Sequence, residues 1–391
     1  MSGFRANREI LTIFAAKLVR TFSYGYLGIL LPLYLADLGL SASGIGASVT
    51  MTLVGSALLT WAVRAPAERL GVRTALLGLA ALTAIAAAML LVTRNPYVVV
   101  LAAMLGNIAV GTGETGPFLS IEQVAIARAA PADRRTTVLS VYNLLGYGAA
   151  ALGAAVVSLG TPHTLFAGFL AAAILQGAAY ALLGRVTLGR SGPRAGPRST
   201  PLIRRLAGLF ALDSFAGGFV LQSLVAYFLH TRFDLDLETL GHVFFVAQLL
   251  TAASLLLAPR LARTWGLLPT MVVTHLVSNV FLITIAFAPV AWLAIALLLA
   301  NRLLSQIDVP TRQAYVMAVV PDREREAAAT TTTLWRTSAQ AITPLITGWV
   351  MQALTLSTPF LLGGGLKIVY DVLLYRTFKD VRPRDPGRED S

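Results

Sequence analysis

The sequence has no cysteine and few charged side chains. The missing thiol excludes disulfides, thiolate nucleophiles and thiolate metal sites. Charged residues are 13% of the 391 residues, whereas a soluble domain carries about 25%. There are four scattered histidines and no H-E-x-x-H, G-x-S-x-G or P-loop motif. We therefore expect neither an enzyme nor direct use of ATP, and no cofactor.

Long apolar runs dominate what is present. The chain is 56% hydrophobic, with a mean hydropathy of +0.71. The runs are long enough to cross a bilayer core of about 30 Å as helices, and they lack the alternation of barrel strands. We predict an all-α integral membrane protein. The net charge of +12 lies in short loops, where it orients a membrane protein, so we expect no nucleic-acid partner.

Twelve membrane-spanning helices are predicted. They begin near Ile10, Ser43, Thr74, Tyr97, Thr136, His163, Leu202, Leu240, Leu268, Val290, Ala327 and Pro359. Alternate loops are rich in arginine, which predicts an inner (plasma) membrane protein with both termini cytoplasmic. Charges interrupt the first run, so we expect no cleavable signal. The Gly-, Pro- and Arg-rich segment 185–201 reads as a cytoplasmic linker between six-helix bundles 1–184 and 202–391, the second with a short tail.

The two halves resemble each other at a nearly constant spacing. Arg20 corresponds to Asp213 and Pro117 to Pro310, each 193 positions later. Between the first two predicted helices the spacing drifts to 195, where Ile45 corresponds to Leu240. A constant shift over so many residues predicts two pseudo-symmetric bundles that arose by duplication.

A carboxylate, Glu114, interrupts the apolar stretch 97–123. A charge at mid-membrane costs about 2.5–3.5 kcal/mol even on a lenient scale, so we predict a continuous helix Tyr97–Ile121 whose Glu114 faces a cavity. Pairing with a neighbouring helix for packing alone is the alternative. The same stretch contains G-x-G-x-x-G from Gly111 to Gly116. A dinucleotide site needs a strand before that motif, so we reject that interpretation.

Opposite charges stand at matching places in the two halves. Arg20 and Asp213 are predicted to face each other as a salt bridge, either a switch for transport or a permanent structural contact. Asp308 lies two residues before Pro310, where a broken helix suits coordination of a cation or substrate. Alternatively, Arg312 one turn further on neutralises Asp308.

Further polar side chains complete the set of candidates. Glu114 has no basic residue within one turn and is the first candidate for carrying a proton; Asp213 is the second. Arg336 corresponds to Asn143, and either binds an anionic substrate or neutralises Asp308. Aromatic and amide side chains line a mixed pocket or simply pack between helices: Tyr24, Tyr26, Phe22, Phe215, Gln222 and Tyr142.

Other polar side chains are predicted to be structural. Glu122 is expected at the cytoplasmic end of the fourth span, where it meets arginines of the loops. Lys367 and Asp371 read as an i, i+4 pair on an outer helix. His275 and Asn279 share one face of the ninth span, and the histidine reads as a hydrogen-bonded packing residue.

Six plus six helices around a central linker resemble the major facilitator superfamily. The loop Glu68-Arg69-Leu70-Gly71-Val72-Arg73 is similar to that family's D-R-x-G-R-R loop, and we expect Glu68, Arg69, Gly71 and Arg73 to act in the conformational switch. The resemblance implies that spans 1, 4, 7 and 10 line a central cavity; Arg20, Glu114, Asp213 and Asp308 fall on them. Asn107 replaces an arginine of the family's drug–proton antiporters, and 144–148 lacks their proline.

The resemblance and the buried charges together predict a secondary active transporter working by alternating access. We expect a monomer that moves a small molecule or ion in contact with membrane lipids, coupled to protons, with efflux-type antiport favoured. A facilitator of the same fold without proton coupling is the alternative. A membrane sensor or a membrane enzyme is the alternative of another class.

Overall fold

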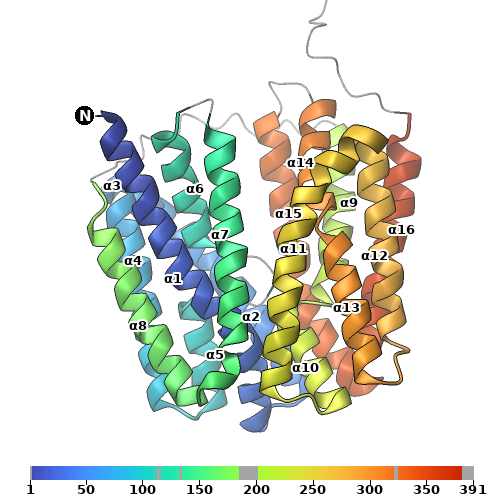
Figure 1. Ribbon diagram of the computed structural model, residues 1–391, viewed down its shortest axis with the longest axis horizontal. Coiled ribbons are helices and arrows are strands. Elements are labelled where there is room, and N and C mark those ends of the chain that lie inside the picture. The colour runs from blue at the N-terminus through green and yellow to red at the C-terminus, as the bar shows by residue number, and fades with distance from the viewer. Residues whose placement is uncertain are drawn as a thin grey trace, which may run out of the picture. The chain divides into compact units, whose positions relative to one another are not determined.

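Helices make up all the regular structure in the described part of this computed structural model, which is 2–109, 111, 116–131, 134–184, 201–320 and 325–380. Figure 1 labels most of them. The first group is α1 (Ser2–Asp37), α2 (Ala42–Ala62), α3 (Arg64–Leu70), α4 (Val72–Val92), α5 (Pro96–Leu105), α6 (Pro117–Ala129), α7 (Arg135–Ala155), the 3-10 turn η1 (Val157–Leu159) and α8 (Pro162–Ala181). The second is α9 (Pro201–Gly218), α10 (Gln222–Phe233), α11 (Leu237–Trp265), α12 (Leu267–Ile285), α13 (Ala291–Ser305), α14 (Asp308–Val319), α15 (Arg325–Ala353) and α16 (Thr358–Phe378).

Nine stretches of the described residues are helical, long and apolar enough to cross a membrane. They correspond to nine of the twelve predicted spans. The predicted fourth span consists of the two shorter apolar helices α5 and α6. The predicted last two spans are α15 and α16, which are long enough but are not among the nine. The prediction of a helical membrane protein is therefore confirmed, and the count of twelve spans is not.

The predicted continuous helix Tyr97–Ile121 is wrong. Helix α5 ends at Leu105, and α6 begins at Pro117. Backbone geometry explains the break: Asn107 and Gly116 have positive φ values of 49° and 109°, which no helix interior tolerates. Pro117 lacks an N–H and so fits the first position of a new helix. Glu114 lies outside the described residues.

The corresponding part of the second half is broken as well. Helix α13 ends at Ser305 and α14 begins at Asp308, two residues before Pro310. Positive φ values repeat in the same way: Gly39 and Asp234 have φ of 90° and 54°, while Gly71 and Gly266 have 91° and 85°. Each pair is 195 positions apart. The repeat seen in the sequence is thus a repeat of backbone conformation.

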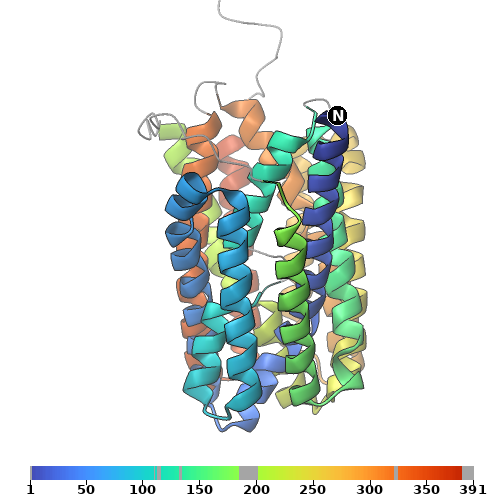
Figure 2. The ribbon, with the colours of Figure 1, turned by 90° about the vertical axis from the view of Figure 1, so that its left-hand side faces the viewer.

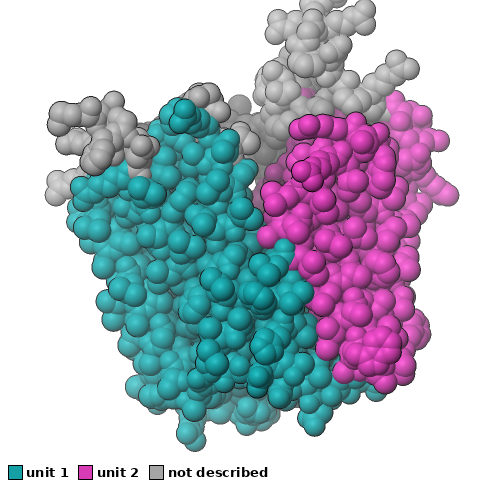
Figure 3. Space-filling view, viewed as in Figure 1, with its two compact units in different colours: residues 1–192, 221–249 teal, residues 193–220, 250–391 magenta. Residues whose placement is uncertain are grey.

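The chain forms two compact units, coloured separately in Figure 3. Unit 1 comprises 1–192 and 221–249, and unit 2 comprises 193–220 and 250–391. Helix α11 therefore contributes its first part to unit 1 and the remainder to unit 2. The proposed boundary between bundles at 185–201 stays a prediction.

In unit 1, α1 packs against α7 and α8, and α4 packs against α8; Figure 2 shows this group from the side. Glycine permits the close approach of α1 and α7. A Cβ on Gly153 would collide with the carbonyl oxygen of Phe22, and one on Gly25 with that of Ala150. The unit's apolar core joins residues of α1, α4, α6, α7 and α8, among them Leu76, Phe118 and Ile126.

In unit 2, α9 packs against α15 and α16, and α12 packs against α13 and α16. Gly218 on α9 lies so close to Thr343 on α15 that an added Cβ would collide with the threonine side chain. Buried Phe210, Met271, Tyr315 and Leu374 belong to the apolar core of this unit. These residues come from α9, α12, α14 and α16.

Candidate functional site: two buried charge networks and a polar pocket

A buried carboxylate that accepts several hydrogen bonds lies inside unit 1. Glu122 on α6 and Arg20 on α1 form an ion pair with an Nη2–Oε2 distance of 2.6 Å, and both side chains are 0% exposed. Arg20 Nη1 also donates to Oε1 at 3.1 Å. The hydroxyls of Tyr142 and Tyr180 donate to the two carboxylate oxygens. Each oxygen of Glu122 therefore accepts from the arginine and from a tyrosine.

Two predictions about these residues are wrong. Glu122 is buried with Arg20, not exposed among loop arginines, because α6 starts only at Pro117 and Glu122 falls in its second turn. Arg20 was predicted to pair with Asp213, but its carboxylate partner is Glu122, and Asp213 has cationic partners of its own in unit 2. Each of these two charges is therefore neutralised within its own unit.

Asp213 is the centre of the network in unit 2. Its Oδ2 accepts from Arg312 Nη1 at 3.0 Å, and its Oδ1 accepts from Lys367 Nζ at 3.0 Å. The same Nη1 of Arg312 donates to Asp308 Oδ2 at 2.8 Å. Asp213, Asp308 and Arg312 are all buried. One aspartate thus joins α9 to α14 and α16, and the local neutralisation of Asp308 by Arg312 is confirmed.

A second carboxylate, Asp371, extends this network through a histidine. His275 Nδ1 lies 2.8 Å from Asp371 Oδ1, and His275 Nε2 lies 3.2 Å from Lys367 Nζ. Asn279 Nδ2 donates to Asp371 Oδ2 at 3.1 Å. The view of Lys367 and Asp371 as an outer i, i+4 pair is wrong: each binds residues of other helices. His275 is hydrogen-bonded, as predicted, and it also belongs to the charge network.

Arg336 lies on α15 at the edge of this network. Its Nε donates to the hydroxyl of Ser214 at 2.9 Å, one residue from Asp213. Within the described residues, no group of three or more His, Asp or Glu side chains is suited to hold a metal ion.

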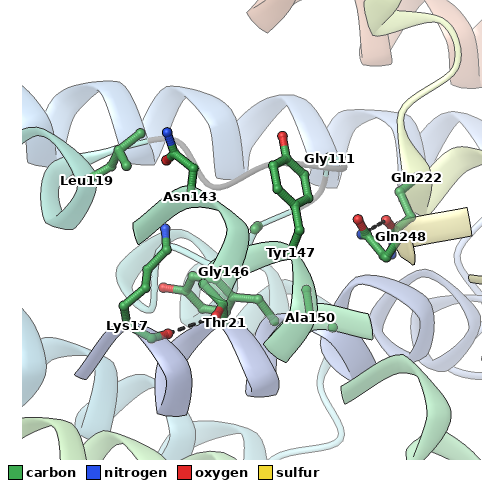
Figure 4. A pocket seen from close by; sticks show the side chains of 13 residues that line it. Lys17, Thr21, Gly111, Leu119, Asn143, Gly146, Tyr147, Ala150, Gln222 and Gln248 are labelled. Carbon is green, nitrogen blue, oxygen red and sulfur yellow. Dashed lines mark hydrogen bonds between the residues drawn. The ribbon is translucent and has the colours of Figure 1, made fainter. Parts of the chain in front are cut away.

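A polar pocket lies in unit 1, with a cavity volume of about 80 Å³ (Figure 4). Its polar lining comes from helices α1, α7, α10 and α11: Lys17, Thr21, Tyr24, Asn143, Tyr147, Gln222 and Gln248. The structure thus brings together three residues that the sequence singled out, Tyr24, Asn143 and Gln222. In Figure 4 the glutamines lie on the other side of Tyr147 from Lys17 and Asn143.

Lys17 connects this pocket to the network of Glu122. Its Nζ lies 4.4 Å from the ring centroid of Tyr142, the tyrosine whose hydroxyl binds Glu122. A Cβ on Gly146 would be 2.6 Å from Lys17 Cε, so the glycine makes room for the lysine stem. The position of the ammonium group is set by α7.

The loop singled out as a conformational switch is helical on both sides of one glycine. Glu68 and Arg69 are exposed on the short helix α3, and Arg73 is half-buried in the first turn of α4. Gly71 between them has φ 91° and ψ 161°, a conformation open essentially to glycine alone.

Several residues of these sites carried no functional prediction. Gln248 and Tyr147 are common types in helices, and no spacing marks them. His275 with Asn279 and Lys367 with Asp371 carried a usable signal: both pairs are four residues apart, so each puts two polar groups on one face of an apolar helix. Two polar faces of this kind within one bundle are expected to pack against each other.

The long apolar helices and the charges buried among them define a helical membrane protein. The chain belongs to the Major Facilitator Superfamily, whose family model matches residues 13–306. A relative 24% identical, an uncharacterised membrane protein of Saccharomyces cerevisiae, aligns with 96% of this chain and 95% of its own length.

Solved transporters share the fold. The nucleoside transporter NupG is similar with a TM-score of 0.75 and 14% identity, covering 95% of this chain and 99% of that one. A D-xylose–proton symporter has a TM-score of 0.71 and 15% identity, covering 97% and 99%. Proteins of this family carry small-molecule substrates.

Proposed function

We propose that this protein is a proton-coupled secondary active transporter that moves a small solute by alternating access. The observation that carries the proposal is the bridging of Asp213 by two cations from different helices, Arg312 and Lys367. Arg312 and Asp213 are buried, and the side chain of Lys367 is partly buried, with 15% of it exposed. A proton on this carboxylate would weaken the contacts of α9 with two other helices at once.

The effect follows from electrostatics at low dielectric. A protonated Asp213 is neutral and no longer attracts Arg312 and Lys367, so both cations are left with less compensation in the membrane interior. The contacts from α9 to α14 and α16 weaken together, which biases the bundle toward another arrangement. Glu114, the first candidate from the sequence, lies outside the described residues and stays a candidate carrier.

We propose antiport of the efflux type as the mode of transport. On the distribution of arginine in the loops we place both termini in the cytoplasm, and we propose a monomer in the inner membrane. A facilitator without proton coupling is the second candidate. Arg312 also donates a hydrogen bond to Asp308, and a network whose protonation never changes satisfies the same hydrogen bonds.

Proteoliposomes with a trapped pH dye test the proposal. A panel of neutral, anionic and cationic small solutes is added outside, and internal pH is recorded with labelled-solute uptake. We expect one solute to change internal pH: antiport makes the lumen alkaline, and symport makes it acid. A solute that equilibrates without any pH change identifies the facilitator.

Asp213→Asn is expected to abolish the solute-dependent pH change while leaving exchange of labelled solute. Asp37→Asn, at an exposed carboxylate at the end of α1, is the matched control and is expected to behave as wild type. Solute-driven proton movement that survives Asp213→Asn in monodisperse protein would refute coupling through this residue.

A further inference from the structure

The geometry of the polar pocket points to its ligand: we propose that it binds a neutral, hydroxyl-rich solute, of the size of a small polyol or monosaccharide. This inference rests on the proposed transport function and names the substrate class. The residues that carry it are Gln222 and Gln248, supported by Thr21, Asn143 and Tyr147 on the pocket wall. Among the described lining residues there is no carboxylate.

The two glutamines form a half-satisfied pair. Gln248 Nε2 donates to Gln222 Oε1 at 2.9 Å, and Gln248 Oε1 is buried with no hydrogen-bond partner. A buried acceptor without a donor is unfavourable, because it has lost its hydrogen bonds to water and gained none from the protein. A ligand that supplies a donor at this point removes that penalty, which is a direct gain on binding.

A hydroxyl group is the ligand group that fits this pair. It both donates and accepts, so it satisfies Gln248 in either orientation of the amide. Thr21 commits its hydroxyl hydrogen to the carbonyl of Lys17 at 2.8 Å, which leaves its oxygen as an acceptor for a second ligand hydroxyl. Asn143 and Tyr147 offer donors and acceptors further along the wall.

Lys17, the single cation among the described lining residues, does not call for an anionic ligand. Lys17 Nζ is held over the ring of Tyr142 at 4.4 Å, and that ring belongs to the residue bound to Glu122. Its charge is therefore already engaged inside unit 1. A cationic ligand is disfavoured, because it would bring a like charge into the same small pocket as Lys17.

Size and polarity set the remaining limits. A volume of about 80 Å³ corresponds to roughly six water-sized spheres at about 10–15 Å³ each. Polar groups occur on several sides of the pocket, which suits a compact solute with hydroxyls in several directions. A bulky apolar compound would leave Gln248 Oε1 without a donor.

Three sugars of one carbon skeleton and different charge test the inference. Binding of D-glucose, D-gluconate and D-glucosamine to detergent-solubilised wild type is measured by calorimetry, which needs no transport. We expect D-glucose to bind tightest. Gln248→Met, which keeps length and removes hydrogen bonding, is expected to weaken D-glucose about ten-fold, since a lost hydrogen bond of about 1.4 kcal/mol is a factor of ten.

Gln123→Met is the matched control, because Gln123 lies in unit 1 on α6 but outside the pocket; D-glucose affinity should not change. Tightest binding of gluconate or glucosamine, no binding of any of the three, or D-glucose affinity unchanged in Gln248→Met would each overturn the inference. Binding and gradient-free exchange of labelled D-glucose without any pH change would refute proton coupling and leave this inference standing.

Discussion

The ammonium group of Lys367 lies 3.2 Å from Nε2 of His275. An ammonium group has only donors, so Nε2 accepts and the ring hydrogen is on Nδ1, toward Asp371 at 2.8 Å. One lysine therefore binds two acceptors, His275 and Asp213. The order Asp213, Lys367, His275, Asp371 forms a continuous chain of hydrogen bonds from α9 through α16 to α12 and back to α16.

Removing Lys367 alone is expected to destabilise unit 2 strongly. In Lys367→Met, Asp213 loses one of its two cations while it stays buried, and breaking a buried pair on one side costs about 3–5 kcal/mol. The double variant Lys367→Met/Asp213→Asn removes both charges and should recover a large part of the loss. Thermal unfolding in detergent provides both values. Equal losses in the single and double variants would contradict the pairing.

The sequence predicted the helical class, the family resemblance and the repeat, because these depend on apolar length and on a spacing kept over the whole chain. It predicted that Asp213 and Asp308 are buried, because apolar neighbours surround them. The partner predicted for Arg20 was wrong. Position along two equivalent helices shows which charges match, but the packing of α6 against α1 decides which side chains meet.

The break between α5 and α6 was missed for a similar reason. Hydropathy is continuous from Tyr97 to Ile121, and a hydropathy scan does not register backbone dihedral angles. Asn107 and Gly116, both with positive φ, were visible only as an asparagine and one of several glycines. The pocket residue Gln248 was missed because a single amide in an apolar helix is ambiguous until its neighbour Gln222 is known.

The Arg20–Glu122 pair is expected to be essential for the stability of unit 1. Glu122→Ala leaves a buried guanidinium and the hydroxyls of Tyr142 and Tyr180 without their acceptor, for an expected loss of about 3–5 kcal/mol. Tyr180→Phe should cost less, about 1–2 kcal/mol, since it removes a single hydroxyl.

The double variant Arg20→Met/Glu122→Met separates charge from packing. It replaces the pair by apolar side chains of similar length, and we expect it to unfold at a higher temperature than Glu122→Ala in the same detergent. A double variant that is less stable than Glu122→Ala would contradict this expectation, and one that is less stable than wild type would show that the ion pair contributes more than it costs to bury.

Gly71 is expected to tolerate no side chain without strain. At φ 91° and ψ 161°, an alanine occupies a region that costs about 1–3 kcal/mol. Gly71→Ala should therefore lower the midpoint of thermal unfolding, and Gly266→Ala, at the repeat-related position with φ 85°, should do so to a similar extent. Unchanged midpoints in both variants would refute the view that the two turns need glycine.

The crossing of α1 and α7 is expected to depend on the absence of side chains at two positions. In Gly153→Ala the new methyl meets the carbonyl oxygen of Phe22, and in Gly25→Ala it meets that of Ala150. A backbone atom cannot rotate away, so the helices must separate and the core beneath them loses contact. Gly78→Ala on α4 is the matched control, because nothing lies within 4 Å of its added Cβ and alanine is favoured over glycine in a helix by about 1 kcal/mol. We expect the first two variants to give little monodisperse protein in size-exclusion chromatography and the control to equal or exceed wild type in unfolding temperature. Wild-type yield and stability in Gly153→Ala would mean that α1 and α7 are further apart than described.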